Sequence, residues 1–361
     1  TKTGVSNLQL FSVGNLKEIN ETEPNDNRDT APEVALNTCI NGVVNSEEVD
    51  YFPIQLKAND RFAVEVEAMR LGTAMFDPKL RLFDPTGTEV LAEDDTQMFR
   101  QDAGFVYVAK TDGRYVIAVN EASFGGSGDS YYRLHIGTFP RPFAVSPIGG
   151  QPGQQLELSW LGDPGLSKHT VTVPALDPGT RLIVAANDAG VAPTELPFRI
   201  SKYAGVQEVE PNNDAATATA GTAPGAFDGV IQDKGDLDYF KFTGTKGQVY
   251  DIRVWARALG SPLDSVVYII APSGSQFAGD DDAAAVDSYM RVTLPEDGEY
   301  KVYVLDHLKR GGPAFAYRIE VTPIDPTVKI TTLENRPFSL TLPRDNTGYL
   351  LVNCARADFD G

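Results

Sequence analysis

The sequence predicts an all-β protein in which two large antiparallel β-sandwiches alternate with smaller β modules. Three observations favour this fold. Apolar and polar residues alternate, as in 61–67, with the period of two that half-buried strands show. Turn sequences such as Asp112-Gly113 and Asp297-Gly298 recur between such stretches. Finally, a stretch of about 115 residues occurs twice, and such an internal repeat indicates tandem copies of one domain.

The two copies share landmarks at a nearly constant distance. Each copy begins with Glu-x-Glu-Pro-Asn, at 21–25 and at 208–212, which is an offset of 187 (208 − 21). The offset is 188 (238 − 50) at Asp-Tyr-Phe, 187 (281 − 94) at a pair of aspartates, and 185 (297 − 112) at Asp-Gly-x-Tyr. Agreement at four separated places, with a drift of a few residues, indicates a tandem duplication.

The segment between the copies has the pattern of a short all-β module of the immunoglobulin-like kind, with strand-like runs such as 155–160 and 170–173. Residues 4–13 resemble the end of that segment. The predicted organisation is therefore the tail of a preceding small module at 1–20, a sandwich at 21–139, a small module at 140–207, a second sandwich at 208–323, and the start of a further, incomplete module at 324–361. The stretches 31–36 and 215–220 are expected to form a turn or two of helix.

Bulk properties limit the classes of function. The length of 361 residues suggests two or three domains, and the 42% hydrophobic content is that of a globular protein. The net charge of −19 (31 − 50) argues against nucleic acid as a partner, because phosphate binding needs a basic surface. No run approaches the roughly 20 apolar residues of a membrane helix, so membrane insertion is not expected. The chain begins without Met and is expected to be part of a longer protein.

The cysteines Cys39 and Cys354 fall in different modules and do not form a disulfide framework. A bond between them stays open, but buried free thiols are the preferred interpretation.

Oxygen-bearing side chains gather at the start of each copy. Glu21, Glu23, Asn25 and Asp26 lie within six residues. In an extended chain, 21, 23 and 25 point to the same side. A second segment, with Glu48 and Asp50 in the first copy and Asp236 and Asp238 in the second, could add further oxygens. Such a set suits Ca²⁺, which takes six to eight oxygen ligands.

Other interpretations of this cluster remain. The acids could simply solvate a linker, with Asn and Asp forming a turn. Mg²⁺ fits less well because it retains water and requires octahedral geometry. Zn²⁺ is disfavoured because neither His nor Cys accompanies the cluster. The occurrence of the same donors in both copies favours a cation site over a solvated linker.

The pattern Glu-x-Glu-Pro-Asn, then Gly-x-Ile/Val, Asp-x-Asp-Tyr-Phe and Gly-x-Tyr-x-Val, resembles the bacterial pre-peptidase C-terminal domain family. The resemblance covers both large repeats. It implies a jelly-roll-like β-sandwich of a secreted or surface protein, similar in fold to the collagen-binding domains of clostridial collagenases. It also implies a structural calcium ion bound by the acidic segment and an Asp of the next strand. The implied ligands are Glu21, Glu23, Asn25, Asp26 and Asp50 in the first copy, and Glu208, Glu210, Asn212, Asn213 and Asp238, with Asp236, in the second.

Two positions depart from this pattern. Asn213 stands where the first copy has the acid Asp26, so the second site is expected to be weaker or to use Asp214. Glu48 stands where the second copy has Asp236, and its longer side chain leaves its role open. The two calcium sites are therefore expected to differ in affinity.

The expected function is non-catalytic. Only three histidines are present, and the sequence has neither a Gly-x-Ser-x-Gly elbow nor a His-Glu-x-x-His or phosphate-binding motif. The leading hypothesis is a calcium-stabilised spacer or adhesion array of a secreted or surface bacterial protein, joined to other modules of a longer chain. The alternative is an accessory module that binds collagen-like protein or polysaccharide for a secreted hydrolase. The acidic stretches at 93–95 and 280–282 are expected to be solvated loops between strands, with a second cation site as the alternative.

Overall fold

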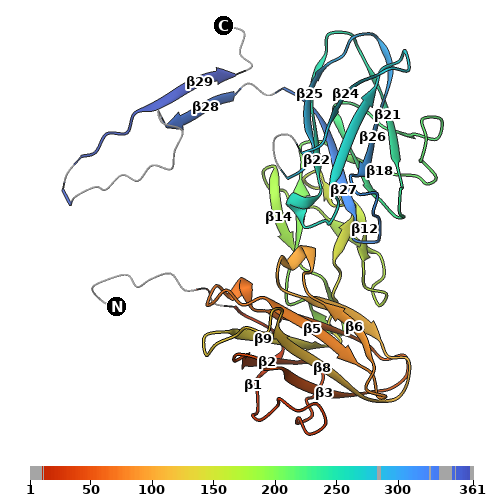
Figure 1. Ribbon diagram of the computed structural model, residues 1–361. Coiled ribbons are helices and arrows are strands. Elements are labelled where there is room, and N and C mark those ends of the chain that lie inside the picture. The colour runs from red at the N-terminus through yellow and green to blue at the C-terminus, as the bar shows by residue number, and fades with distance from the viewer. Residues whose placement is uncertain are drawn as a thin grey trace.

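The computed structural model describes residues 10, 12–282, 286–324, 327–332, 344–345 and 347–357. The predicted all-β class is confirmed: in this part of the chain the helical elements are the 3-10 helices η1 (Met69–Leu71), η2 (Gln97–Phe99) and η3 (Arg257–Leu259). Figure 1 shows two large β-sandwiches, one at each end of a smaller β module. None of the helices in the described ranges has the length and apolar character that a membrane span requires.

The first sandwich consists of two sheets. One sheet has the strand order β1 (Lys17–Asn20), β2 (Thr38–Val43), β9 (Tyr131–Gly137), β4 (Arg61–Glu67), β7 (Gly104–Val108). The other has the order β3 (Asp50–Leu56), β8 (Gly113–Glu121), β5 (Pro78–Phe83), β6 (Glu89–Glu93). Alternate residues of β5 are buried, so Leu80 and Leu82 enter the core between the sheets. This burial of one strand face is what the period-two pattern predicted.

The second sandwich repeats this strand order. One sheet runs β18 (Gly205–Gln207), β20 (Gly225–Val230), β27 (Ala316–Pro323), β22 (Val249–Trp255), β25 (Tyr289–Thr293). The other runs β19 (Thr219–Ala220), β21 (Asp238–Gly244), β26 (Gly298–Asp306), β23 (Ser265–Ile270), β24 (Gln276–Asp280). The structure therefore shows the duplication as two equivalent sandwiches, except that β19 extends the second sheet of the second copy.

The repeated Asp-Gly-x-Tyr sequence forms the entry to a central strand. Gly113 and Gly298 have φ values of +145° and +144°, a region that residues with a side chain rarely adopt. Two residues later, the buried Tyr115 hydroxyl donates to the Thr111 carbonyl at 3.1 Å, and Tyr300 donates to Glu296 in the same way at 2.6 Å. The motif thus anchors the start of β8 and β26 on the preceding turn, as tyrosine corners do in other sandwiches.

The small module lies between the sandwiches and is coloured yellow to green in Figure 1. Its sheets have the orders β10 (Ala144–Ser146), β12 (Gln155–Leu161), β13 (His169–Thr172), then β11 (Gly149–Gly150), β17 (Leu196–Ile200), β14 (Gly179–Ile183), and finally β15 (Ala186–Asn187) with β16 (Gly190–Val191). After the second sandwich, β28 (Thr327–Thr332) and β29 (Val352–Ala357) form an antiparallel pair.

Two module boundaries and one expectation about helices need correction. Strand β1 pairs in parallel with β2, so residues 17–20 belong to the first sandwich rather than to a preceding module; β18 likewise belongs to the second sandwich, ahead of residue 208. The stretches 31–36 and 215–220 form no helix, because Val34 and β19 pair with neighbouring strands, and segments of six residues are too short to sustain a helix. Residues 1–9 lie outside the described residues.

The cysteines are both free, and Cys39 is buried as expected. Cys354 is exposed, contrary to the expectation of two buried thiols. It lies in β29, which pairs with β28 alone among the described strands.

Buried charges join the first sandwich to the small module. Arg141, which is fully buried, donates to Glu65 at 2.5 Å, and Arg70 pairs with the same carboxylate at 3.1 Å. Thr194 of the small module also donates to Glu65, and Arg61 pairs with Asp163. Because these charges are removed from water, each of them depends on its partner.

We expect Arg141→Met to destabilise the chain by about 3 kcal/mol, because it leaves part of the Glu65 charge buried without its partner. The matched control is Lys168→Met, which removes an ion pair whose side chains are 68% and 61% exposed; it should change stability by less than about 1 kcal/mol. Calorimetric unfolding measures both. Equal effects of the two substitutions would contradict this view of the junction.

Candidate cation sites at the start of each sandwich

The first candidate site forms where the segment after β1 meets the start of β3. Glu21 is held by the Val43 amide, which donates to its Oε1 at 2.8 Å. Glu23 accepts from the Asn25 amide at 3.0 Å, and Asn25 Nδ2 donates to Glu21 at 3.3 Å. Asp50 opens β3 and is fully buried. One carboxylate oxygen from each of Glu21, Glu23 and Asp50 lies within 4.8 Å of the others.

A tyrosine and a glycine complete this arrangement. The Tyr132 hydroxyl lies 2.6 Å from Asp50 Oδ2 and 3.0 Å from Glu21 Oε2, and its single proton can be donated to one of them at a time. Gly42 lies directly beneath: a Cβ there would be 2.3 Å from the Tyr132 hydroxyl oxygen and 2.7 Å from Glu21 Oε2. The hydroxyl and the carboxylate therefore approach each other only because residue 42 has no side chain.

The second copy builds the same cluster. Carboxylate oxygens of Glu208, Glu210 and Asp238 lie within 4.8 Å of one another. The Tyr317 hydroxyl lies 2.6 Å from Asp238 and 3.3 Å from Glu208. The Val230 amide donates to Glu208 at 2.9 Å, as the Val43 amide does to Glu21. A Cβ at Gly229 would again lie 2.3 Å from the tyrosine hydroxyl.

Each cluster combines a buried aspartate, a half-buried glutamate and an exposed glutamate, so part of its negative charge is removed from water. Burial raises the pKa of Asp50 to about 8 and that of Asp238 to about 7. Burial, and then the nearby Asp238 charge, raise the pKa of Glu208 to about 9; burial also raises the pKa of Glu21. Without a bound cation, each cluster therefore retains protons near neutral pH, since several like charges in one buried site disfavour ionisation.

Several oxygen atoms in these clusters lack a donor. Among the described residues, Asn25 Oδ1 and Asp50 Oδ1 are buried without a hydrogen-bond partner. In the second copy the Asn212 amide group lies 3.2 Å from Glu210 Oε2 and 3.3 Å from Asp238 Oδ1, with its oxygen facing them. Turning the amide would let its nitrogen donate to both carboxylates. A hard cation in each cluster would instead satisfy Asn25 Oδ1 and Asp50 Oδ1 in the first copy and the Asn212 oxygen in the second, without turning the amide.

The structure brings together eight of the predicted ligands, namely the six carboxylates of the two clusters with Asn25 and Asn212. Asp26, Glu48 and Asp236 are outside the two carboxylate groups, and the Asn213 side chain donates to Asp236 at 2.9 Å. Glu48 accepts from the Asn45 backbone amide at 2.6 Å and holds its own turn. Asp236 accepts from the Gln232 and Leu237 amides and from the Asn213 side chain, which occupies both of its oxygens. The acids at which the copies differ, Asp26, Glu48 and Asp236, are thus not in the carboxylate groups.

Sequence reasoning missed the tyrosines and glycines of both sites. Tyr132 and Tyr317 are both fully buried. The available signal was their occurrence at the same place in both copies, 185 residues apart (317 − 132), with the glycines 187 apart (229 − 42). A buried tyrosine keeps its hydroxyl satisfied, which could have directed attention to the acids.

The acidic loops farther along each copy differ in their charge compensation. In the first copy Asp94 and Asp95 lie beside Asp77, with carboxylate oxygens within 4.8 Å of one another. In the second copy Asp281 contacts His307 at 2.8 Å, and Asp264 contacts Arg257 at 3.2 Å. These loops are not repeated as one arrangement, unlike the clusters at the start of each sandwich.

One buried group has the residue types of a catalytic triad. Cys39 and His135 face each other on β2 and β9, and His135 Nε2 lies 3.6 Å from Glu67. Burial opposes protonation, but the Cys39 and Glu67 side chains raise the pKa of His135 to about 9. Cys39 is fully buried and His135 is 1% exposed. The group therefore has no access for a substrate, and a protonated imidazole is not a base.

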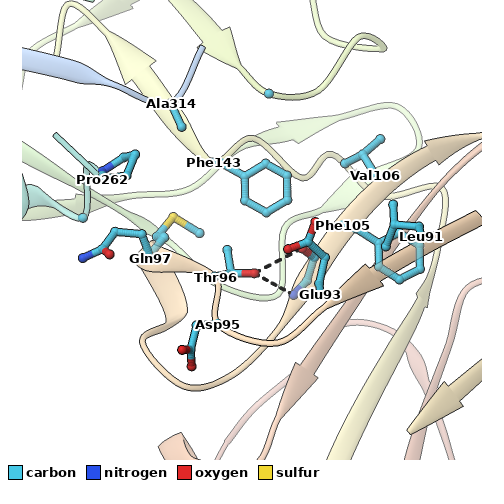
Figure 2. A pocket seen from close by; sticks show the side chains of 14 residues that line it. Leu91, Glu93, Asp95, Thr96, Gln97, Phe105, Val106, Phe143, Pro262 and Ala314 are labelled. Carbon is cyan, nitrogen blue, oxygen red and sulfur yellow. Dashed lines mark hydrogen bonds between the residues drawn. The ribbon is translucent and has the colours of Figure 1, made fainter. Parts of the chain in front are cut away.

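A pocket of about 440 Å³ opens where the two sandwiches and the small module meet (Figure 2). Phe143 projects into it from the small module, and Pro262 and Ala314 border it from the second sandwich. On the first sandwich, Thr96 exchanges hydrogen bonds with Gly104 and closes the loop that forms one wall. Partial burial raises the pKa of Glu93, a half-buried acid of this wall. The pocket walls depend on all three modules keeping their relative positions.

The outer face of the second sandwich carries a row of three tyrosines. Tyr239 and Tyr303 are cross-strand partners with ring centroids 4.6 Å apart, and Tyr268 lies 5.1 Å from Tyr303 on the next strand. All three side chains are half-buried. At the equivalent register the first copy has Tyr51, Ala118 and Arg81, so the row belongs to the second sandwich alone.

Comparisons with known proteins point to one family. Residues 236–305 match the family model described as the bacterial pre-peptidase C-terminal domain, which confirms the resemblance for this segment. A probable subtilase-type serine protease of Deinococcus radiodurans is 42% identical over 66 residues. This match spans 18% of the present chain and only 9% of that protein.

Solved structures give weaker likenesses. The pre-peptidase C-terminal domain of collagenase from Bacillus anthracis is 16% identical, covering 29% of this chain and 93% of that one, with a TM-score of 0.24. Tandem CBM51 modules of a family 98 glycoside hydrolase from Streptococcus pneumoniae are 10% identical, covering 80% and 83%, with a TM-score of 0.20. TM-scores this low do not establish a common fold.

We expect Gly42→Ala to disrupt the first cluster, because the added methyl group overlaps the Tyr132 ring and hydroxyl. The overlap should destabilise the protein by about 1–3 kcal/mol. Gly128→Ala is the matched control, since a Cβ at Gly128 meets nothing within 4 Å. Thermal unfolding of the two variants measures the difference. If both unfold together with the unsubstituted chain, the close approach at residue 42 has no energetic role.

Proposed function

Because its second sandwich contains a bacterial pre-peptidase C-terminal domain segment, we propose that this chain is a non-catalytic accessory array of a secreted or cell-surface protein. Each large sandwich binds one structural calcium ion, and the small module holds the two sandwiches apart. The array acts as a spacer or adhesion segment beside other modules of a longer chain. The observation that carries this proposal is the pair of equivalent carboxylate clusters, each built around a buried aspartate.

The donor set fits calcium. Each cluster offers three carboxylates and an asparagine oxygen, all hard ligands, and neither thiol nor imidazole. The carboxylates accept hydrogen bonds from amides and from a tyrosine hydroxyl. Their charged neighbours, however, are other carboxylates, which carry the same negative charge. A bound divalent cation would neutralise that charge. The residues that would hold it are Glu21, Glu23, Asn25 and Asp50, and Glu208, Glu210, Asn212 and Asp238.

Calcium at these positions would also stiffen the entry to each sandwich. Glu21 and Glu23 precede β2 in the chain, whereas Asp50 begins β3 in the opposite sheet. Tyr132 reaches the same point from β9. A cation held by these side chains would join the entering segment to both sheets, so its binding energy adds directly to the stability of the folded state.

We expect calcium to raise the unfolding temperature, since a ligand present at a hundredfold excess over its Kd adds about 2.7 kcal/mol. Asp50→Asn and Asp238→Asn should each remove the response of one sandwich. Asp29→Asn, at a carboxylate that is 83% exposed, is the control and should retain it. Calorimetry with calcium or with chelator provides the measurement. The same unfolding temperature in both conditions would contradict the proposal.

We also expect calcium to change how stability depends on pH. A carboxyl group whose folded pKa is raised loses stability as the pH rises above its unfolded pKa of about 4, and the loss continues until the folded pKa is passed. For Asp50 the folded pKa is about 8. The unfolding temperature of the metal-free protein should therefore fall from acidic to mildly alkaline pH. Calcium should abolish this fall because it stabilises the ionised form. A fall of equal size with and without calcium would contradict a shared site.

A second candidate function is the binding of collagen-like protein or polysaccharide on behalf of an attached hydrolase. The tyrosine row formed by Tyr239, Tyr303 and Tyr268 favours it, because aligned aromatic rings provide a flat apolar surface with polar edges. This row occurs in one copy only, which suits a specific binding face better than a repeated structural feature. The spacer role remains the main proposal because the carboxylate clusters occur in both copies.

A further inference from the structure

The second sandwich and the small module share one apolar core. Val230 and Ala316 are cross-strand partners at the ends of β20 and β27, and they are 8% and 0% exposed. Leu259 of η3 is 3% exposed. All three belong to a single buried cluster with side chains of the small module, among them Ala144, Val145, Ile148, Phe198 and Ile200. This end of the second sandwich is therefore a docking face for the module that precedes it.

Polar contacts border this apolar face. Arg199 of the small module pairs with Glu320 at 3.2 Å and lies over the Trp255 ring, 4.1 Å from its centroid. Trp255 Nε1 also donates to Glu320 at 3.1 Å. These contacts place an arginine of the incoming strand β17 against β22 and β27 of the sandwich.

The first sandwich has the same face. By the register of the two copies, the pair Val43 and Tyr131 at the ends of β2 and β9 corresponds to Val230 and Ala316. Leu71 of η1 corresponds to Leu259, and each helix ends in a left-handed glycine. Glu67 stands at the position of Trp255 on the central strand.

The incoming chain segment follows the same path in both copies. Strand β1 pairs in parallel with β2 through Glu18 and Cys39, and β18 pairs with β20 through Gly205 and Ala226, 187 residues further on in each case (205 − 18 and 226 − 39). Ser12, at the position of Arg199 (199 − 187 = 12), donates to Glu67 at 2.8 Å. In the second copy β17 contacts η3. In the first copy the equivalent contact is that of Leu10 with Gly72, the residue after η1.

The two faces differ in what covers them. In the second sandwich the face is buried, whereas in the first Tyr131 is 47% exposed and Met75, in the loop after η1, is 89% exposed. Leu10 and Val13 of the incoming segment are 67% and 81% exposed, although Ile200, at the position of Val13, is fully buried. Large apolar side chains gathered on one surface mark an interaction site.

We propose that this face of the first sandwich, formed by Val43, Leu71, Met75 and Tyr131 with Leu10 and Val13, docks a small β module of the same kind as residues 140–200, placed ahead of it in the chain. The repeating structural unit is then a small module docked on the sandwich that follows it, with a period of 187 residues (208 − 21). The array would extend by repeating this contact in one direction, because the small module at 140–207 also binds the sandwich before it, through Arg141 and Glu65.

Two grafted chains test the proposal. The full graft places residues 140–200 directly before Gly14, the position equivalent to Ser201, and carries Tyr131→Ala to match Ala316. The partial graft places residues 140–196 directly before Leu10 and keeps every residue of the first sandwich. Hydroxyl-radical footprinting measures the labelling of Met75 and Leu71. We expect labelling of both to fall about fivefold or more relative to the ungrafted chain, while exposed Tyr349 in the remote segment serves as an unchanged reference.

The control adds Leu71→Glu to each graft, which places a charge in the docking face and should return Met75 labelling to the ungrafted level. Unreduced labelling of Met75 in a graft whose added module folds would overturn the proposal. So would failure of the added module to fold in both grafts while the remaining chain keeps its unfolding transitions, because the second sandwich offers a face on which the same module does fold. If one graft fails to fold, the other decides the outcome.

Discussion

The convergence of carboxylates around a buried aspartate at the start of each sandwich is the constraint on which much of the structure depends. Asp50 and Glu21 come from opposite sides of the core and meet at the hydroxyl of Tyr132. This meeting requires a glycine at position 42, a strand β9 that delivers the tyrosine, and an entering segment held by the Val43 amide. Like charges in a partly buried site repel one another, and this repulsion favours protonation of the carboxylates or a bound cation. The second copy meets the same requirements with its own residues.

The small module contacts both sandwiches and so sets their relative position. Its contact with the first sandwich is ionic and buried, through Arg141 and Glu65, whereas its contact with the second is an apolar cluster bordered by Arg199 and Glu320. The two kinds of contact differ in physical character. Buried ion pairs demand specific geometry because an unpaired charge is costly, whereas apolar burial contributes in proportion to area. The pocket beside Phe143 exists because both contacts hold at once.

Much of the fold and part of the site followed from pattern. Alternation in 61–67 and the repeated turns predicted strands, and the constant offset between copies predicted two equivalent sandwiches. The period of two also placed Glu21, Glu23 and Asn25 on one side, as observed around the cluster. The sequence pattern did not separate Asp236 and Glu48 from the cluster, because each lies two residues before a cluster aspartate. Their actual roles depend on the loop amides that donate hydrogen bonds to them. The limits of the sandwiches were also misplaced, because β1 and β18 are edge strands whose parallel partners lie some twenty residues away in the chain.

By itself the sequence determined that the chain is all-β, that it is duplicated, and that oxygen donors gather where each copy begins, because composition and periodicity are local properties of the chain. Only the tertiary structure decided which donors meet, that Tyr132 and Tyr317 stand between them, and that Gly42 and Gly229 leave the necessary space. It also decided that one face of the second sandwich is covered while its counterpart on the first carries exposed Met75 and Tyr131. These properties arise from contacts between residues distant in the chain, and the pairing of strands across two sheets sets such distances.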